Sequence, residues 1–374
     1  IFFLFYFFNK KKYKIFKNDI FYFLLSFWFL LIFNTLLNDD FNQNYSRAFF
    51  FLRFILLIFL FSYFISYKDS KYRDLIFNIW TIIFIIVSLD LVFEFFFGFN
   101  ILGFKSNYSG RLAGFLGDEL KIGHWYFCFS LILLGHNSNN LKYFYFLLFF
   151  SLIISFFIGE RANFIRLFLA ISFFLVFTKN LSFKILGSLL IATVLIFIIG
   201  NSADKIIKKR FIGDFVSLIK NYESFKTFNE KNPYTPMYLN AYNIFKENKL
   251  LGVGVGSYLE KSHENFRISK PEGNTVNGYL ILPNSHPHQH HFEILATMGL
   301  SGYLFLLIFF LYFFFKAFKF YLIQKDNINL SSFLMVFFMC LPLLPTGSFF
   351  TTYGASMFWL NFALMNLGNF KNIN

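Results

Sequence analysis

The chain has 374 residues, of which 57% are hydrophobic and only 14% are charged, and its mean hydropathy is +0.55. A soluble globular protein carries about 25% charged residues, so this chain cannot cover its surface with polar groups and must have lipid around much of it. The same figures exclude a disordered chain. The two cysteines, Cys128 and Cys340, are too few for a disulfide-stabilised secreted domain, and both lie in apolar runs, as small core residues do. The net charge of +14 indicates a partner only once the distribution of Lys and Arg is known.

The chain begins with an apolar stretch, Ile1–Phe8, that runs directly into Asn9 and three lysines. A signal peptide carries its basic region before the apolar one, so this order argues against that assignment. We expect residues 1–19 to be the remnant of an earlier membrane span followed by a basic cytoplasmic segment.

Ten further segments are apolar over about the 20 residues that a membrane-spanning helix needs. None shows the sustained alternation of polar and apolar residues of a membrane barrel, so helices must satisfy the backbone hydrogen bonds within the bilayer. The sequence therefore predicts an all-α polytopic membrane protein, with about ten transmembrane helices after the partial N-terminal one. The predicted spans are residues 20–37, 48–66, 76–97, 120–136, 141–158, 162–178, 182–200, 292–315, 331–350 and 353–369.

Lys and Arg in the short loops predict the orientation of these spans. One set of alternating loops is rich in them and the other set holds few, so we expect the rich set to be cytoplasmic. The rich set contains Lys10, Lys11, Lys12, Lys14, Lys17, Lys68, Lys71, Arg73, Lys142, Lys179, Lys184, Lys316, Lys319, Lys325 and Lys371, and the poor set contains Arg47, Lys105, Arg111 and Arg161.

One long polar segment, residues 201–291, separates the seventh and eighth spans and contains five of the seven histidines. Loops of this length are usually functional. We expect this one to lie on the outer side of the membrane. It follows a seven-helix transmembrane part, residues 20–200, and precedes a three-helix part, residues 292–374.

The densest polar cluster, Asn284–Glu293, lies at the start of the eighth span. Ser285 or His286 is suited to cap a helix there and Pro287 to occupy its first turn, so we predict that His288 lies in that turn. The helix dipole and desolvation by lipid both favour a neutral imidazole, which a general base requires. Two other interpretations stay open, namely a metal site and a solvated helix start without a catalytic role.

A second cluster, Gly159–Arg161, is a tight polar turn between the fifth and sixth spans, and Arg166 follows it. A guanidinium is always charged and forks onto phosphate oxygens, so Arg161 is a candidate anion ligand. The alternative is a local ion pair between Glu160 and Arg161. We expect the side chain of Arg166 to extend to the membrane interface.

Three other features carry polar or flexible residues. The Gly-rich stretch at residues 109–119 supplies a cation and two carboxylates, and its glycines allow close backbone approach. The glycines at residues 252–256 are not a dinucleotide-binding motif, because no strand–turn–helix surrounds them. Asp90 and Glu94 lie late in the third span, one turn apart, and either line a cation path or lie near the outer interface.

Taken together, these motifs resemble those of the O-antigen ligase and polymerase superfamily of bacterial envelope enzymes. That family's motif is His, then Asn, Ser or Gln, nine residues, Gly, two residues, and Gly, Thr or Tyr. His288, Gln289, Gly299 and Gly302 match it completely. The stretches Ile244–Gly254, Gly159–Arg161, Gly114–Glu119 and Pro345–Phe350 are similar to others in the family. The resemblance extends from about residue 90 to the end of the chain.

The resemblance implies a metal-independent glycosyltransferase of the bacterial inner membrane, with its active site and the 201–291 loop facing the periplasm. The donor would be a glycan on undecaprenyl diphosphate. The acceptor would be the lipid A core for a ligase, or another lipid-linked glycan for a polymerase. No cofactor is implied, and membrane lipids, but no nucleic acid, are further partners.

The same resemblance assigns roles to particular residues. His288 would activate or orient the acceptor hydroxyl, and Arg161 would bind the diphosphate. The acid that the family carries nine residues after this His is Thr297 here. We expect the remaining contacts to the substrate from Arg111, Arg210, Arg267, Asp118, Glu119, His286 and Gln289. A competing hypothesis is a transporter or flippase for an envelope lipid or ion, working through Asp90 and Glu94.

Overall fold

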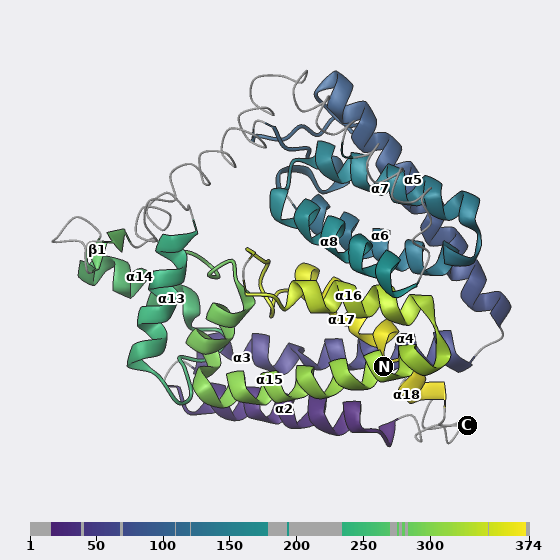
Figure 1. The fold of residues 1–374 in the computed structure, drawn as a ribbon. Helices are drawn as coiled ribbons and strands as arrows, with labels where there is room; N and C mark the ends of the chain where they lie inside the picture. The colour runs from purple at the N-terminus through teal and green to yellow at the C-terminus, as the bar shows by residue number, and fades with distance from the viewer. Residues whose placement is uncertain are drawn as a thin grey trace. The chain divides into compact units, whose positions relative to one another are not determined.

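The computed structural model describes residues 16–38, 41–67, 70–108, 110–119, 121–178, 193, 234–269, 275–276, 279–280, 283–342 and 344–371 (Figure 1). In this part the chain is helical apart from loops and one antiparallel pair of short strands, β1 (Thr275–Val276) and β2 (Tyr279–Leu280). The chain divides into two compact units. Unit 1 comprises Ile1–Ser66, Ser224–Lys316 and Cys340–Asn374, and unit 2 comprises Tyr67–Glu223 and Ala317–Met339.

Unit 1 is built around aromatic side chains. Trp359 is completely buried, and its ring lies 5.7 Å from that of Phe51 and 5.4 Å from that of Phe362, measured between ring centroids. Both pairs are edge-to-face, the arrangement that the charge distribution of aromatic rings favours. The helices of this unit are α2 (Asp19–Leu36), α3 (Phe41–Phe50), α4 (Leu52–Tyr67), α13 (Thr235–Glu247), α14 (Tyr258–Ser269), most of α15 (His290–Gln324), α17 (Thr352–Met365) and α18 (Gly368–Lys371).

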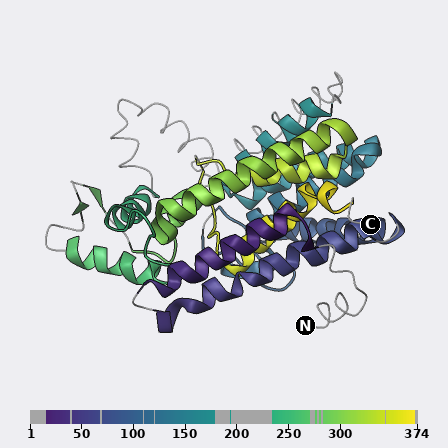
Figure 2. The same ribbon diagram turned by 90° about the horizontal axis from the view of Figure 1, so that it is seen from below.

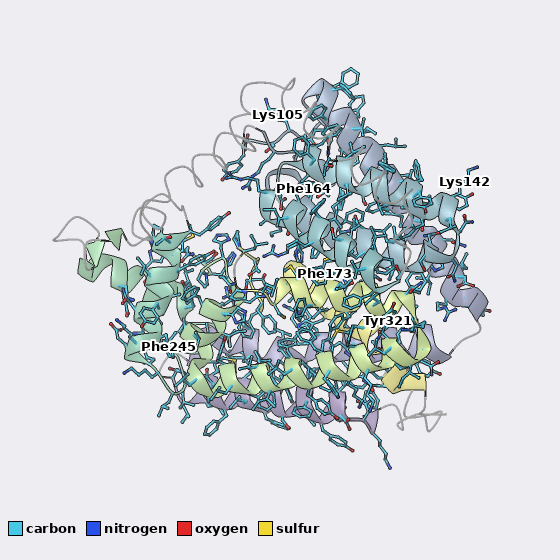
Figure 3. All side chains as sticks on the ribbon, in the orientation of Figure 1. Lys105, Lys142, Phe164, Phe173, Phe245 and Tyr321 are labelled. Carbon is cyan, nitrogen blue, oxygen red and sulfur yellow. The ribbon has the colours of Figure 1, made fainter. Side chains whose placement is uncertain are left out.

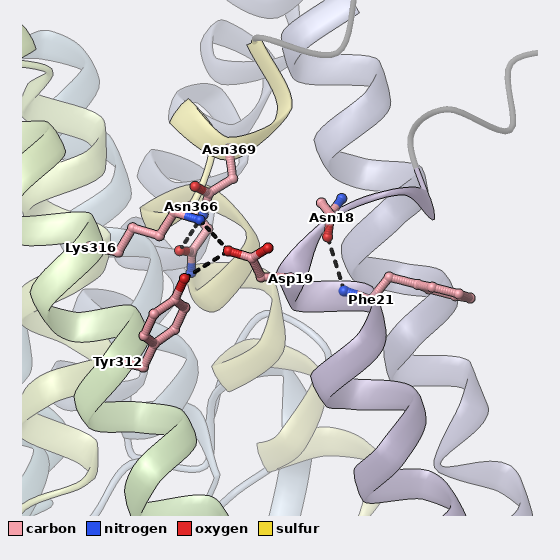
Figure 4. A network of polar contacts seen from close by, with 7 residues as sticks. All are labelled: Asn18, Asp19, Phe21, Tyr312, Lys316, Asn366 and Asn369. Atoms are coloured by element: carbon pink, nitrogen blue, oxygen red, sulfur yellow. Dashed lines mark hydrogen bonds and ion pairs between the residues drawn. The ribbon is translucent and has the colours of Figure 1, made fainter.

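Within unit 1, α2 runs alongside α15 (Figures 1 and 2). Phe23 of α2 packs among the aromatic rings of α15. At the start of α2, Asp19 accepts hydrogen bonds from the hydroxyl of Tyr312 at 2.8 Å and from the ammonium group of Lys316 at 2.7 Å (Figure 4). Asn18 caps the same helix through its side-chain oxygen. These polar contacts fix the register of α2 against α15.

α15 is interrupted at Gly299, whose backbone is left-handed with φ +63° and ψ −161°. The helix gives up its own hydrogen bonds there and forms others with a preceding segment. The N–H of Leu300 donates to the carbonyl of Lys249 at 2.8 Å, and the N–H of Val253 donates to the carbonyl of Ala296 at 3.0 Å. A Cβ atom at position 299 would collide with the backbone of this segment. The glycine is therefore required for both its conformation and its lack of a side chain.

Unit 2 is centred on α6 (Ile122–His136), which is buried along nearly its whole length. Gly135 allows α16 (Asn327–Met339) to approach closely, because a Cβ atom there would collide with Ser331. Aromatic pairs add contacts between helices of this unit, and the ring of Phe173, which Figure 3 labels, lies 5.6 Å from that of Phe338 in α16, measured between ring centroids. The remaining helices are α5 (Ser70–Phe97), η2 (Gly114–Glu119), η3 (Asn137–Asn139), α7 (Leu141–Ile158) and α8 (Arg161–Phe177).

Five helical segments in the described part are long and apolar enough to cross a membrane, namely Asp19–Leu36, Tyr45–Ile65, Tyr72–Phe97, Leu141–Ile158 and His290–Gln324. On α5 the exposed side chains include large aliphatic ones. Ile82 and Ile86 are both 58% exposed, and Leu89 is 55% exposed. Water is a poor solvent for such a surface and lipid a good one. The helical class and the presence of several spans are therefore confirmed, whereas the count of ten stays a prediction.

The ninth predicted span differs from the observed helix. It was expected to cover residues 331–350, but α16 ends at Met339, and residues 340–342 and 344–351 are not helical. Pro342 and Pro345 explain this correction, because proline has no N–H to donate within a helix. The predicted seventh span, apart from residue 193, and residues 201–233 of the long loop lie outside the described residues. The division into four parts by sequence remains a prediction.

Candidate active site

His288 lies in unit 1, immediately before α15. Gln289 caps this helix, because its carbonyl accepts from the N–H of Glu293 at 3.0 Å and its side-chain oxygen accepts from the N–H of His291 at 2.6 Å. The predicted cap at Ser285 or His286 is therefore wrong, and His288 precedes the first turn instead of lying in it. Its backbone is left-handed, with φ +52°, which is incompatible with the helix.

The environment of His288 favours a neutral imidazole. Its ring is half-buried, with its centroid 4.2 Å from that of His286 and 5.7 Å from that of Tyr234. Burial lowers the pKa of the His288 imidazole, because desolvation disfavours the charged form. The sequence predicted this direction, and the structure assigns it to burial among neighbouring rings. A neutral imidazole can accept a proton from a hydroxyl group near neutral pH.

The segment at residues 340–350 holds the start of α15 from the other side. The N–H of Thr346 donates to the carbonyl of His288 at 2.8 Å. The side chain of Gln289 donates to the carbonyl of Leu341 at 3.3 Å. Two hydrogen bonds to consecutive residues fix the backbone around the candidate base. Pro345–Phe350, which the sequence marked only as a familiar motif, is thus a structural neighbour of His288.

His291 takes part in the same contact and is therefore unsuited to be a base. Its Nε2 atom lies 2.7 Å from the carbonyl of Cys340, which can only accept, so this nitrogen carries the proton. Its Nδ1 atom, 3.1 Å from the hydroxyl of Tyr303, then accepts. Both ring nitrogens are occupied by protein groups.

Glu293 is a residue whose importance the sequence analysis missed. It is only 4% exposed, and its two carboxylate oxygens accept from the hydroxyl of Ser348 and from the N–H of Phe349, the latter at 2.7 Å. A buried carboxylate without such partners would be strongly destabilising. Its position in an otherwise apolar helix was the available signal. Glu293 joins α15 to the segment that contacts His288.

These contacts also bear on the metal interpretation of the histidine cluster. A metal held by these histidines would need an acid to complete its ligand set, and the oxygens of Glu293, the acid in the cluster, are bonded within the protein. Among the described residues, no three His, Cys, Asp or Glu side chains are placed to hold a metal ion.

Arg161 lies in unit 2, as the first residue of α8. Gly159 ends α7 in a left-handed conformation with φ +77°, and a Cβ atom there would collide with the carbonyl oxygen of Gly110. Beside this contact, the N–H of Leu112 donates to the carbonyl of Ile158 at 3.1 Å. The turn before Arg161 is therefore packed directly on the backbone at Arg111. Arg161 and Arg111, which the sequence predicted from separate motifs, therefore come from adjacent loops of unit 2.

Glu160 accepts hydrogen bonds from residues of two helices. One carboxylate oxygen accepts from the N–H of Gly123, at the start of α6, at 3.0 Å, and the other accepts from the side chain of Asn163 at 2.7 Å. Asn163 in turn accepts from Arg166 at 3.1 Å. The expected extension of Arg166 to the membrane interface is wrong, since this side chain is 1% exposed. The polar chain of Glu160 and Asn163 gives the buried guanidinium a partner, as burial of a charge requires.

Asp90 and Glu94 act as anchors for the loop at residues 98–114 of unit 2, which the sequence predicts to be on the outer side. The carboxylate of Glu94 accepts from the N–H groups of Ala113 and Gly114, each at 2.7 Å, and Asp90 accepts from the N–H of Ile101 at 2.8 Å. Buried acids with backbone partners need no transported cation to balance their hydrogen bonding. These contacts give both acids a structural role, and none of them favours the transporter hypothesis.

The other predicted substrate contacts divide into two groups. His286 and Gln289 lie beside His288 in unit 1, as described above, and Arg111 lies beside the Arg161 turn in unit 2. The side chains of Asp118, Glu119 and Arg267, and the whole of Arg210, lie outside the described residues.

Comparison with known proteins shows a similarity to a family over part of the chain. No curated protein matches the chain. Residues 146–307 match the family model described as O-antigen ligase, and this segment contains the Gly159–Arg161 turn and the complete motif from His288 to Gly302. Glycan transfer in envelope polysaccharide synthesis is the activity associated with this family. This match confirms the predicted resemblance of residues 146–307 to the O-antigen ligase and polymerase superfamily.

Proposed function

We propose that the protein transfers a glycan from undecaprenyl diphosphate to a sugar hydroxyl, at the periplasmic face of the bacterial inner membrane and without a metal ion. The acceptor is the lipid A core if the enzyme is a ligase, or another lipid-linked glycan if it is a polymerase. One observation carries the proposal. The segment that matches the O-antigen ligase family includes both Arg161 and His288, each within its expected motif.

His288 acts on the acceptor in this proposal. Its neutral imidazole accepts the proton of the attacking hydroxyl. General-base catalysis of this kind typically increases the rate by about 10²–10⁴-fold. The hydrogen bond from the N–H of Thr346 fixes its backbone, so little reorganisation is needed when the acceptor binds. His286, with its ring 4.2 Å away, and Gln289 complete the polar surroundings.

Arg161 acts on the donor. A lipid diphosphate is already a good leaving group, so the enzyme must mainly stabilise the negative charge that develops on it. A guanidinium serves this purpose with two parallel hydrogen bonds to phosphate oxygens. Arg111, on the loop packed against the Arg161 turn, supplies a second positive charge within unit 2.

The first prediction concerns these two residues. We expect His288→Ala and Arg161→Ala each to reduce glycan transfer by the purified protein from a lipid-linked oligosaccharide by at least about 100-fold. Arg161→Lys should also be poor, because a point charge does not fork onto a diphosphate. His263→Ala, which changes an exposed histidine of α14, and Arg73→Ala, which changes a surface arginine of α5, are the matched controls.

Wild-type rates in both the His288 and Arg161 variants would exclude these residues from the site. The substitutions Asp90→Asn and Glu94→Gln test the transporter hypothesis. A protein that works through these acids would lose its function in both variants and would keep it in His288→Ala.

A lipopolysaccharide gel from a deletion strain separates the two family activities. Loss of all long chains indicates a ligase, and retention of a single-repeat band indicates a polymerase.

A further inference from the structure

We propose that a row of five aromatic rings beside His288 binds the acceptor saccharide. The row, called the aromatic ladder here, consists of Phe292, Tyr238, Tyr234, His288 and His286. This inference rests on the glycan transfer proposed above and adds to it a binding surface for one of the two substrates.

The ladder is assembled from three elements of unit 1. Tyr234 and Tyr238 lie at the start of α13, His288 and His286 lie in the loop before α15, and Phe292 lies in the first turn of α15. Successive ring centroids are 5.1 Å apart for Phe292 and Tyr238, 6.2 Å for Tyr238 and Tyr234, and 5.7 Å for Tyr234 and His288. The rings of the first two pairs are nearly parallel, with interplanar angles of 13° and 16°.

One end of the ladder lies against the core, and its character changes along its length. Phe292 packs against a buried cluster formed by Ala241, Ile244, Val253, Tyr258 and Ala296. The four rings beyond it all carry a hydrogen-bonding edge, and each is half-buried. The chain contains 66 Phe and 21 Tyr, so Phe is its ordinary choice for filling apolar space. Phenol and imidazole edges at four successive positions therefore indicate a purpose beyond packing.

A saccharide has the complementary chemistry. A pyranose ring presents apolar C–H groups on its faces and hydroxyl groups around its rim. Tyr and His rings likewise combine an apolar face with a polar edge, which suits them to surfaces that are apolar on one side and wet on the other. Binding sites of this kind are lined by aromatic side chains with a few placed polar groups.

The composition of the ladder also distinguishes between the two substrates. The donor carries a diphosphate, which needs cationic ligands such as Arg or Lys, and the ladder contains no Arg or Lys side chain. The acceptor needs a surface for sugar rings that ends at the residue receiving the hydroxyl proton. The ladder ends at His288 and His286, so a saccharide lying along Tyr238 and Tyr234 would bring a hydroxyl group to His288.

The test separates binding of the acceptor from the chemical step. We expect Tyr238→Ala and Tyr234→Ala to raise the KM for the acceptor by roughly tenfold while kcat and the KM for the lipid-linked donor change less than about twofold. Tyr238→Phe and Tyr234→Phe keep the rings and remove the hydroxyl groups, so their effect should be smaller. The matched control is Tyr242→Ala on the same helix, which removes a 41% exposed tyrosine that belongs to the ring pair with Phe245.

A binding measurement keeps the inference independent of transfer. The probe is the core oligosaccharide released from lipopolysaccharide by mild acid, observed by saturation-transfer NMR with the full chain in detergent. We expect binding to wild type and to Tyr242→Ala, weaker binding to the Tyr238 and Tyr234 alanine variants, and no competition by inorganic pyrophosphate. Thermal unfolding of each variant establishes whether it is folded. Where an alanine variant is unfolded, the corresponding phenylalanine variant takes its place in the binding measurement.

The outcomes distinguish this inference from the proposed function. If wild type transfers glycan and the Tyr238 and Tyr234 variants keep its acceptor KM and its probe binding, the ladder is not the acceptor site although the function stands. If wild type fails to transfer glycan but binds the probe in a manner that depends on Tyr238, the function is overturned and a saccharide site remains. Competition by pyrophosphate would overturn the assignment to the acceptor.

Discussion

At His288 a left-handed backbone and a half-buried ring occur in the same residue. A residue with a side chain adopts this backbone conformation at a cost of about 1–2 kcal/mol, and it persists only where its surroundings enforce it. Two contacts hold this conformation in place. The N–H of Thr346 donates to the carbonyl of His288, and Gln289, the residue that follows His288, caps α15. Strain of this kind gathers at residues that carry chemistry, which supports the role proposed for His288.

The pH dependence of transfer follows from the state of this imidazole. Burial lowers the pKa of His288, so the neutral base persists as the pH falls through about 6.5, the value of an unperturbed histidine. We therefore expect kcat/KM to decline only below that value, and the pH profile measures this. The stability of the fold also decreases as the pH falls. The unfolded chain, in which His288 has its ordinary pKa, binds the proton at a higher pH than the folded protein does. An acid limb centred above about 6.5 would contradict the assignment.

Among the elements, α15 does the most to position the site. Its break at Gly299 lets it exchange backbone hydrogen bonds with the segment at residues 249–254. Its first turn is held by Glu293 to residues 348 and 349. The first glycine of the motif from His288 to Gly302 therefore has a structural explanation. Gly299 allows the helix to break against another backbone, and this break lies eleven residues after the histidine that we propose as the base.

This explanation predicts the effect of a methyl group at the break. Gly299→Ala should destabilise the protein by about 2–4 kcal/mol, because it adds a collision with the backbone at Leu250 to the cost of a positive φ. Gly103→Ala is the matched control, since Gly103 has φ +83° with open space around it and bears the conformational cost alone. Thermal unfolding in detergent measures the difference. Equal losses in the two variants would show that the close approach at Gly299 contributes nothing.

At the scale of the whole molecule, composition and the distribution of charge set the relation to the membrane. Several helices are apolar enough to span a bilayer, and the aliphatic side chains exposed on α5 form a surface that lipid can cover. The alternation of Lys-rich and Lys-poor loops predicts that His288 and Arg161 are on the outer side. An outer location is what transfer onto an envelope glycan requires.

Accessibility labelling tests this orientation. In a variant with both native cysteines replaced by serine, His263→Cys in α14 should react with a membrane-impermeant maleimide added to intact spheroplasts. Lys142→Cys, at the start of α7, should react only after the membrane is opened. Both positions are exposed, so a difference between them reports sidedness. Labelling of Lys142→Cys in intact spheroplasts would reverse the predicted orientation and remove the site from the periplasm.

How far the site could be predicted differs from residue to residue. His288 and Arg161 could be proposed from the sequence because their motifs have fixed spacing along the chain. The position of His288 before the helix was missed, because Ser285 and Pro287 together suit a helix start, whereas in the structure Gln289 caps α15 and His288 has a positive φ. Glu293 was missed as an anchor because its partners lie 55 and 56 residues away.

The sequence by itself determined that the protein is helical, that lipid surrounds much of it and that residues 146–307 resemble the O-antigen ligase family. A bilayer leaves the backbone few ways to satisfy its hydrogen bonds, and local motifs keep their spacing in any context. Only the tertiary structure decided which groups accompany those motifs. It made Glu94 an anchor, buried Arg166 beside Asn163, and brought Tyr234 to His288. Such contacts join residues on different turns or distant segments, and no local pattern specifies them.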